Sequence, residues 1–205
     1  MLPLHIFEER YRELVRTLLE RPEPTDRIFG VVAIRRGWEV EQDSDTISLY
    51  DVGCTAEIRE VTEHEDGTFD IVTVGRRRYS ITEVLPPGTP WLRAEVTYLP
   101  DQPGPSGDAD LLGPRVIAAF RAYLRTVRLD AADDQLPDDP QVLSHLVAAT
   151  ASLSVADRQT LLAAPDTATR LRKELVLLHR EIGLLSQVRA VPVSLSDLPV
   201  RPGPN

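Results

Sequence analysis

Few side chains in this sequence could carry out catalysis, and the one lysine is the clearest test. Any mechanism that requires a catalytic lysine has a single candidate, Lys173. No glycine-rich GxxxxGK[ST] loop precedes it, so a phosphate-binding loop of that kind is excluded. A serine–lysine dyad would also need Lys173, which stands in the charged helical stretch RLRKEL. A solvated helix face is therefore the favoured interpretation of this residue.

Neither cysteine chemistry nor metal binding is indicated by the remaining candidates. Cys54 falls among the inward-facing residues of a predicted strand, where cysteine usually packs as a small hydrophobe. Metal sites need clustered ligands, whereas His5, His64, His145 and His179 are scattered along the chain. No GxSxG elbow is present. We therefore expect no enzymatic activity, no cofactor and no metal.

The basic cluster of the chain is Arg76, Arg77 and Arg78, in the segment GRRRY. Three adjacent arginines could contact phosphate or an acidic partner. The favoured interpretation is a solvent-facing strand end whose charges pair with nearby carboxylates, namely Glu57, Glu60 or Asp70. The formal net charge of −9 also argues against a chain whose main task is to bind nucleic acid, because that binding depends on phosphate neutralisation.

Length and composition set the broad class. The 205 residues can form one large domain or two small ones with a real core. One cysteine forbids an internal disulfide, which indicates a reducing, cytoplasmic setting. No apolar run approaches the roughly 20 residues needed to span a bilayer, and the N-terminus has no signal-peptide pattern. We expect no membrane partner.

The elements that position these residues are strands in the first half of the chain. Leu4 and Ile6 run directly into an amphipathic helical pattern at 7–20, so no strand is predicted ahead of that helix. IFGVVAIRR and VGCTAEIREV read as strands, with a bulge or bend before Val61. Asp66-Gly67 is a hairpin signal between that strand and FDIVTV, which RRYSITEV follows.

The segment WLRAEVTYL alternates cleanly and predicts an antiparallel strand with one buried face. The buried face would carry Leu92, Ala94, Val96 and Tyr98, and Trp91 would lie on the opposite face. Exposure of Trp91 is therefore expected.

Helices are predicted beyond a linker at 101–112, which is rich in proline and glycine. The first runs from about Gly113 to Leu129, with Pro114 tolerable only in its first turn. Ser154 followed by Asp157 is a variant of the capping box, and Asp166 caps the longest helix. That longest helix carries an apolar stripe, which favours packing against sibling helices over a dimer seam. Residues 190–205 are expected to be extended or disordered.

The order of these segments resembles a known family. LPLHIFEERYRELV is similar to the signature that opens the Lon protease N-terminal domain, also called the Lon substrate-binding domain. The family's central strands read approximately V-G-T, an apolar strand, D-G, then G-x-x-R-[FY]-x-I. The matching positions here are Val52, Gly53, Asp66, Gly67, Gly75, Arg78, Tyr79 and Ile81. LSVADRQTLLAAPDTATRLRKELVLL resembles the helical half, so the resemblance covers about residues 2–189.

The resemblance implies an α+β fold, a PUA-like antiparallel pseudo-barrel followed by a C-terminal helical bundle. The expected divisions are a β subdomain at 1–100, the linker at 101–112, a helical bundle at 113–189 and the tail. The family's usual first strand, of the type FPLxxVLFPG, has no counterpart here, so the β subdomain is expected to lack it and to leave an edge unpaired. ATPase and peptidase domains are also absent from the sequence, and a stand-alone form is expected.

The function that the resemblance implies is non-catalytic binding of protein or peptide segments, as an adaptor in protein quality control. Trp91 and Arg76–Arg78 are the candidate partner-binding residues. The expected partners are unfolded polypeptide or a partner protein, and a homo-oligomer through the exposed edge or the long helix is a further expectation. Two alternatives stay open, an RNA-binding PUA-like protein and a barrel that binds a small molecule.

Overall fold

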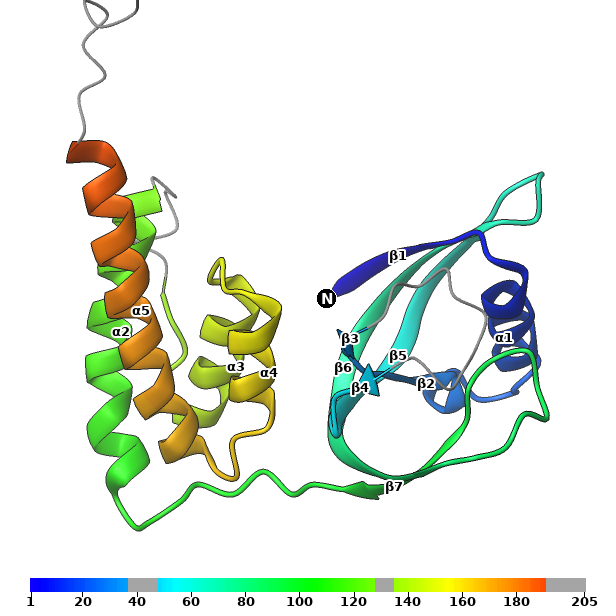
Figure 1. Ribbon diagram of the computed structural model, residues 1–205, viewed down its shortest axis with the longest axis horizontal. Helices are drawn as coiled ribbons and strands as arrows, with labels where there is room; N and C mark the ends of the chain where they lie inside the picture. Colours follow the sequence, from blue (N-terminus) through cyan, green and yellow to red (C-terminus); the bar gives the residue numbers. More distant parts are fainter. Residues whose placement is uncertain (37–47, 128–134, 191–205) are drawn as a thin grey trace, which may run out of the picture. The chain divides into compact units, whose positions relative to one another are not determined.

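The chain divides into two compact units, Met1–Pro100 and Asp101–Asn205. Figure 1 shows the computed structural model, which describes residues 1–36, 48–127 and 135–190. Strands form most of the first unit and helices form the second. An antiparallel sheet followed by helices confirms the predicted α+β class. None of the helices in the described ranges is long and apolar enough to cross a membrane.

The first unit is built around one long strand. Its elements are β1 (Leu2–Ile6), α1 (Glu9–Leu19), the 3-10 turn η1 (Pro24–Asp26), β2 (Ile28–Val31), β3 (Ile34–Arg36), β4 (Ser48–Leu49), β5 (Val52–Glu63), β6 (Phe69–Val84) and β7 (Ala94–Tyr98). The sheet order is β1-β6-β5-β2, all antiparallel, and β3 and β4 form a separate pair. β5 covers one edge of β6, while β1 and β7 share its other edge, at Phe69–Thr73 and Tyr79–Val84.

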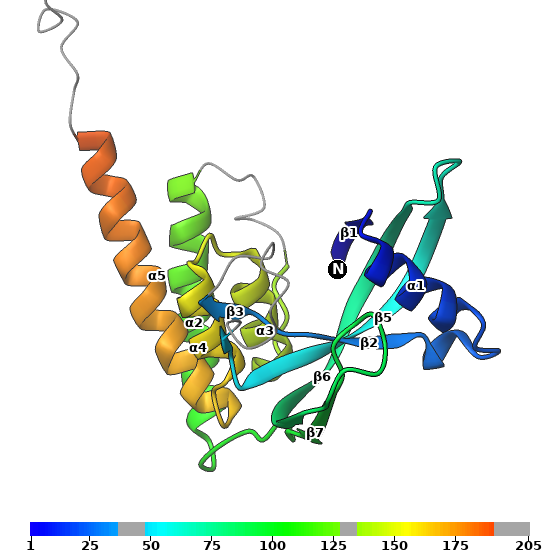
Figure 2. The same ribbon diagram turned by 45° about the vertical axis from the view of Figure 1, so that its right-hand side comes forward.

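Helix α1 covers one face of the sheet, as Figures 1 and 2 both show. Its apolar stripe buries Val15 and Leu18 against Phe69 and Ile71, the inward-facing residues of β6. Burial of each such side chain contributes about 1.5–3 kcal/mol. This cluster is the core of the first unit.

The expectation that no strand precedes α1 is wrong. Leu2–Ile6 forms β1, in which Leu4 is opposite Ile71 and Ile6 is opposite Phe69. The alternation of Leu4 and Ile6 is a strand pattern, and the extended backbone of Glu8 (φ −69°, ψ 135°) separates it from the helix. Absence of the family's own first strand stays a prediction.

The β5–β6 hairpin follows the sequence closely. The register shifts between Ile58 and Glu60, which confirms the bulge predicted before Val61. At the turn, Gly67 has φ +76° and the Asp66 carboxylate accepts from the Thr68 N–H at 3.0 Å. The hairpin signal at Asp66-Gly67 is therefore confirmed.

The second unit contains α2 (Asp108–Val127), α3 (Pro140–Thr150), α4 (Val155–Leu162) and α5 (Thr167–Ala190). α2 and α5 lie side by side in both views, and their core-facing residues share one cluster with α3. In the apolar stripe of α5, Leu171, Leu175 and Leu178 are buried in that cluster, so the stripe is core. The cap predictions are confirmed, because Asp157 N–H donates to Ser154 Oγ and Thr169 N–H to the Asp166 carboxylate.

The start of α2 differs from the prediction. The helix begins at Asp108, so the last residues of the expected 101–112 linker are helical and Pro114 lies inside the helix. Ala109 and Leu112 are buried in the core, and this tertiary packing outweighs the hydrogen bond that proline removes. Of the expected tail, Ala190 ends α5 and residues 191–205 lie outside the described ranges.

Candidate functional site

Strand β7 presents an exposed apolar surface. All five of its residues are exposed, so the prediction of one buried face is wrong. Val96 and Tyr98 are 37% and 44% exposed, and the flanking Leu92 and Val84 are 55% and 49% exposed. An alternating sequence shows that the two faces of a strand differ, but it does not show that either face is buried. In the described part of the first unit, the core cluster includes residues of α1 and none of β7.

The outer edge of β7 can accept another strand. Among the described residues, β6 is the strand that pairs with β7. Leu99 N–H donates to the Arg78 carbonyl oxygen at 2.9 Å, and N–H groups alternate in direction along a strand. The N–H groups of Val96 and Tyr98 therefore point away from β6, because the register from Val96 to Tyr98 is unbroken. Edge strands of this kind pair readily with extended peptides.

Trp91 lies just before β7 and is half-buried, so its expected exposure is found only in part. Thr89 Oγ1 donates to the Trp91 carbonyl oxygen at 2.7 Å, which fixes the backbone of this loop. Leu92, its neighbour, is the more exposed of the two. Trp91 is therefore a candidate contact at the margin of the β7 surface.

The arginines of GRRRY occupy three different environments. The pairing of β5 with β6 shifts register at Thr55, which forms a bulge. At this bulge the Thr55 hydroxyl accepts a hydrogen bond from the Arg77 N–H at 3.0 Å. Arg76 Nε donates to a buried Glu57 carboxylate at 2.5 Å, and this hydrogen bond lowers the pKa of Glu57. The Arg77 guanidinium lies 3.7 Å from the centre of the Tyr98 ring.

Arg78 is buried, with 4% of its surface exposed. Its guanidinium donates to the Pro100 carbonyl oxygen at 3.2 Å. The interpretation of the cluster as solvent-facing is therefore wrong for Arg78, because the strand turns that side chain inward. The expected pairing of the cluster with Glu57 is found for Arg76. Of the three arginines, Arg77 is the one that contacts the β7 surface, through the Tyr98 ring.

The structure also brings together residues that the sequence scatters. His5 on β1 and His64 after β5 both contact Asp70 on β6, at 2.7 and 2.8 Å. The expectation of scattered histidines is wrong for this pair, since strand pairing joins positions that are far apart in the chain. The sequence signal was weak, because only the register shows that His5 is opposite Asp70.

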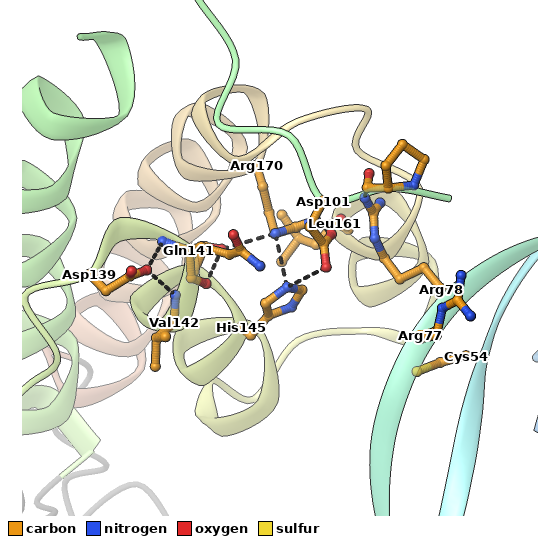
Figure 3. A network of polar contacts seen from close by, with 12 residues as sticks. Cys54, Arg77, Arg78, Asp101, Asp139, Gln141, Val142, His145, Leu161 and Arg170 are labelled. Atoms are coloured by element: carbon orange, nitrogen blue, oxygen red, sulfur yellow. Dashed lines mark hydrogen bonds and ion pairs between the residues drawn. The ribbon is translucent and has the colours of Figure 1, made fainter. Parts of the chain in front are cut away.

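A second polar cluster is buried in the helical unit (Figure 3). Arg170 on α5 is 1% exposed and donates to Ser144 Oγ on α3 at 3.0 Å and to the Leu161 carbonyl oxygen at 3.2 Å. It also lies 3.5 Å from Asp101, which precedes α2. These contacts tie α5 to three other segments, so Arg170 has a structural role that sequence patterns did not indicate.

Comparisons with known proteins agree with this architecture. A profile of the ATP-dependent protease La (LON) substrate-binding domain matches residues 1–180. Lon protease 2 of Herpetosiphon aurantiacus is 30% identical over 178 residues, and Lon protease 1 of Thermus thermophilus is 31% identical over 171. These alignments cover 85% and 80% of this chain but only 22% and 21% of the relatives.

Two solved structures share the fold. The Lon N-terminal domain protein from Xanthomonas campestris aligns with a TM-score of 0.56 and 21% identity, over 85% of this chain and 88% of that one. The N-terminal domain of the Mycobacterium avium complex Lon protease aligns with a TM-score of 0.60 and 18% identity, over 89% and 90%. Because the family profile matches residues 1–180, the chain belongs to the LON substrate-binding domain family.

Proposed function

We propose that this chain is a non-catalytic module that recognises exposed polypeptide segments and binds them along β7. The family supports a role in substrate recognition. The observation that carries the proposal is the β7 surface, which combines exposed apolar side chains with a strand edge that no other described strand pairs with. A client segment in an extended conformation would pair with the edge and bury Val96 and Tyr98.

The candidate catalytic groups support a non-catalytic role. Lys173 Nζ donates to the Thr160 carbonyl oxygen at 3.3 Å, on the surface of the helical unit. Cys54 is half-buried within β5, with its thiol 3.4 Å from the Thr55 carbonyl oxygen. In the Lys173 contact, the ammonium group donates to a backbone carbonyl oxygen and not to a serine hydroxyl that it could activate.

The arginine environments favour polypeptide over RNA. Arg76 is neutralised by Glu57, and Arg78 is buried. RNA binding would therefore rest on Arg77 alone within this cluster, and Arg77 is stacked on Tyr98. A single guanidinium over an aromatic ring can equally bind a peptide carbonyl or carboxylate.

The test is fluorescence anisotropy with a labelled, permanently unfolded polypeptide, reduced and carboxymethylated α-lactalbumin, at low and high salt. We expect binding that changes little with salt and that Val96→Asp weakens at least tenfold. The matched control is Val176→Asp, which adds the same charge at a 69% exposed position on α5. Equal loss in both variants would contradict a site on β7. Steeply salt-dependent binding of single-stranded RNA, without polypeptide binding, would replace the proposal with the RNA alternative.

A further inference from the structure

His5, His64 and Asp70 form a compact cluster on one face of the sheet. His5 Nδ1 is 2.7 Å from Asp70 Oδ1, and His64 Nε2 is 2.8 Å from Asp70 Oδ2. The donor atoms of the three residues all lie within 4.8 Å of one another. Each carboxylate oxygen therefore holds one imidazole, and both rings point toward the same small volume.

Strand register, and not a flexible loop, holds the cluster in place. His5 and Asp70 are directly opposite each other on β1 and β6, and Thr62 on β5 is opposite Asp70 on the other side. His64 follows Thr62 by two residues, which returns its side chain to the same face. The opposite face carries Phe69 and Ile71 in the core, so the backbone beneath the cluster is anchored.

The donor set and its spacing suit a transition metal. We propose that His5, His64 and Asp70 form a site for a divalent transition metal ion, and that Zn²⁺ suits it best because imidazole and carboxylate are usual Zn²⁺ ligands. Bonds of about 2.0–2.1 Å in a tetrahedral site place donor atoms about 3.3 Å apart. The ring nitrogens must therefore move about half an ångström away from Asp70 and also close to the same spacing from each other, starting from a separation of at most 4.8 Å.

The surroundings favour a cation and leave room for a further ligand. All three side chains are exposed, and a depression of about 290 Å³ that includes His5 and Asp70 is also lined by Glu60 and Thr62. The hairpin around His64 adds Glu63, Glu65 and Asp66 to the local negative charge. Three protein ligands leave one position of a tetrahedral ion for water or for a group on a molecule in the depression.

A bound ion would also fasten β1 to the hairpin. His5 is on β1, Asp70 is on β6 and His64 directly follows β5, so one ion would join two strands and the start of the β5–β6 turn. Because the ion binds the folded state, it adds stabilisation free energy that grows with the logarithm of metal concentration above the dissociation constant, and the melting temperature of the first unit rises accordingly. The site is independent of peptide binding on β7.

The experiment is isothermal titration calorimetry of the untagged full chain with ZnCl₂. We expect one strong site in the wild type, with affinity at least tenfold lower in His5→Gln, His64→Gln and Asp70→Asn. The matched control is His179→Gln, which removes an exposed histidine from α5 and should leave the affinity unchanged. CaCl₂ and MgCl₂ should give no comparable binding, because these ions prefer all-oxygen sites.

A second measurement needs no variant. Co²⁺ added to the wild type should give the visible absorption of a four-coordinate ion and paramagnetic shifts of the His5 and His64 ring protons in NMR spectra. A thiolate charge-transfer band would instead place the ion at Cys54 and overturn the assignment. Absence of Zn²⁺ binding, or an equal affinity loss in His179→Gln, would overturn it as well.

Discussion

Glu174 should make the stability of the helical unit fall as the pH rises. Its side chain is 1% exposed on α5, and neither carboxyl oxygen has a hydrogen-bond partner among the described residues. Desolvation by burial raises its pKa from 4.5 to about 9, although the nearby Arg170 charge acts in the opposite direction. The folded chain therefore keeps the carboxyl protonated at neutral pH.

Proton linkage gives the direction and the magnitude of the change in the free energy of unfolding with pH. Between the two pKa values the folded state holds a proton that the unfolded state has released, so stability falls with increasing pH. The loss is absent below the unfolded value of 4.5 and complete above about 9. Each pH unit inside the window costs about 1.4 kcal/mol, so the free energy of unfolding should fall by about 3 kcal/mol between about pH 5 and about pH 7.5.

Glu174→Gln isolates this contribution, since glutamine keeps the shape and cannot ionise. Urea unfolding followed by far-UV circular dichroism reports the helical unit, and tryptophan fluorescence reports the first unit, which contains both tryptophans. We expect the variant to gain about 3 kcal/mol relative to the wild type from about pH 5 to about pH 7.5, in the helical transition only. A constant difference would refute the reasoning and show that Glu174 is ionised and paired with Arg170.

Three further predictions test the fold and the β7 surface. Ser154→Ala removes the N-cap of α4 and should lower the free energy of unfolding by about 1 kcal/mol in urea titrations followed by circular dichroism; an unchanged value would show that the cap is dispensable. Gly53→Ala places a Cβ against both the Tyr79 ring and the Val31 carbonyl oxygen, and should destabilise the first unit by about 1–3 kcal/mol by tryptophan fluorescence. Equal stability would mean that both the ring and the β2 backbone move aside. Val96→Pro removes an N–H that points away from β6, so it should weaken polypeptide binding in the anisotropy assay while the chain stays folded. Thr97→Pro removes an N–H that points toward β6, so it should destabilise the sheet. Full binding by Val96→Pro would exclude pairing at this edge.

Local signals in the sequence predicted those parts of the fold that local physics determines. The caps at Ser154 and Asp166 depend on residues three apart, and the Asp66-Gly67 turn depends on one glycine with positive φ. Such features need no knowledge of the rest of the chain. The same patterns predicted strands first and helices second, and the family resemblance then implied how they assemble into a PUA-like pseudo-barrel and a helical bundle.

Features that depend on pairing across the chain could not be predicted in the same way. Alternation in WLRAEVTYL shows two faces but does not show whether anything covers either one, and in β7 both are exposed. GRRRY shows three charges, but the bulge opposite Thr55 decides that Arg76 meets Glu57 and that Arg78 is buried. A bulge changes the direction of every side chain after it, so an error of one residue in register reverses such assignments.

The length of β6 explains how one small sheet can carry two separate sites. The cluster at Asp70 and the pairing with β7 at Ser80 are ten residues apart on the same strand, which corresponds to about 33 Å of extended backbone. Direct electrostatic coupling over that distance is screened at physiological salt. The core beneath Phe69 and Ile71 anchors the first end, while the second end leaves its apolar side chains exposed. Rigid support favours metal ligation and an open edge favours strand addition, so each end of β6 suits the role proposed for it.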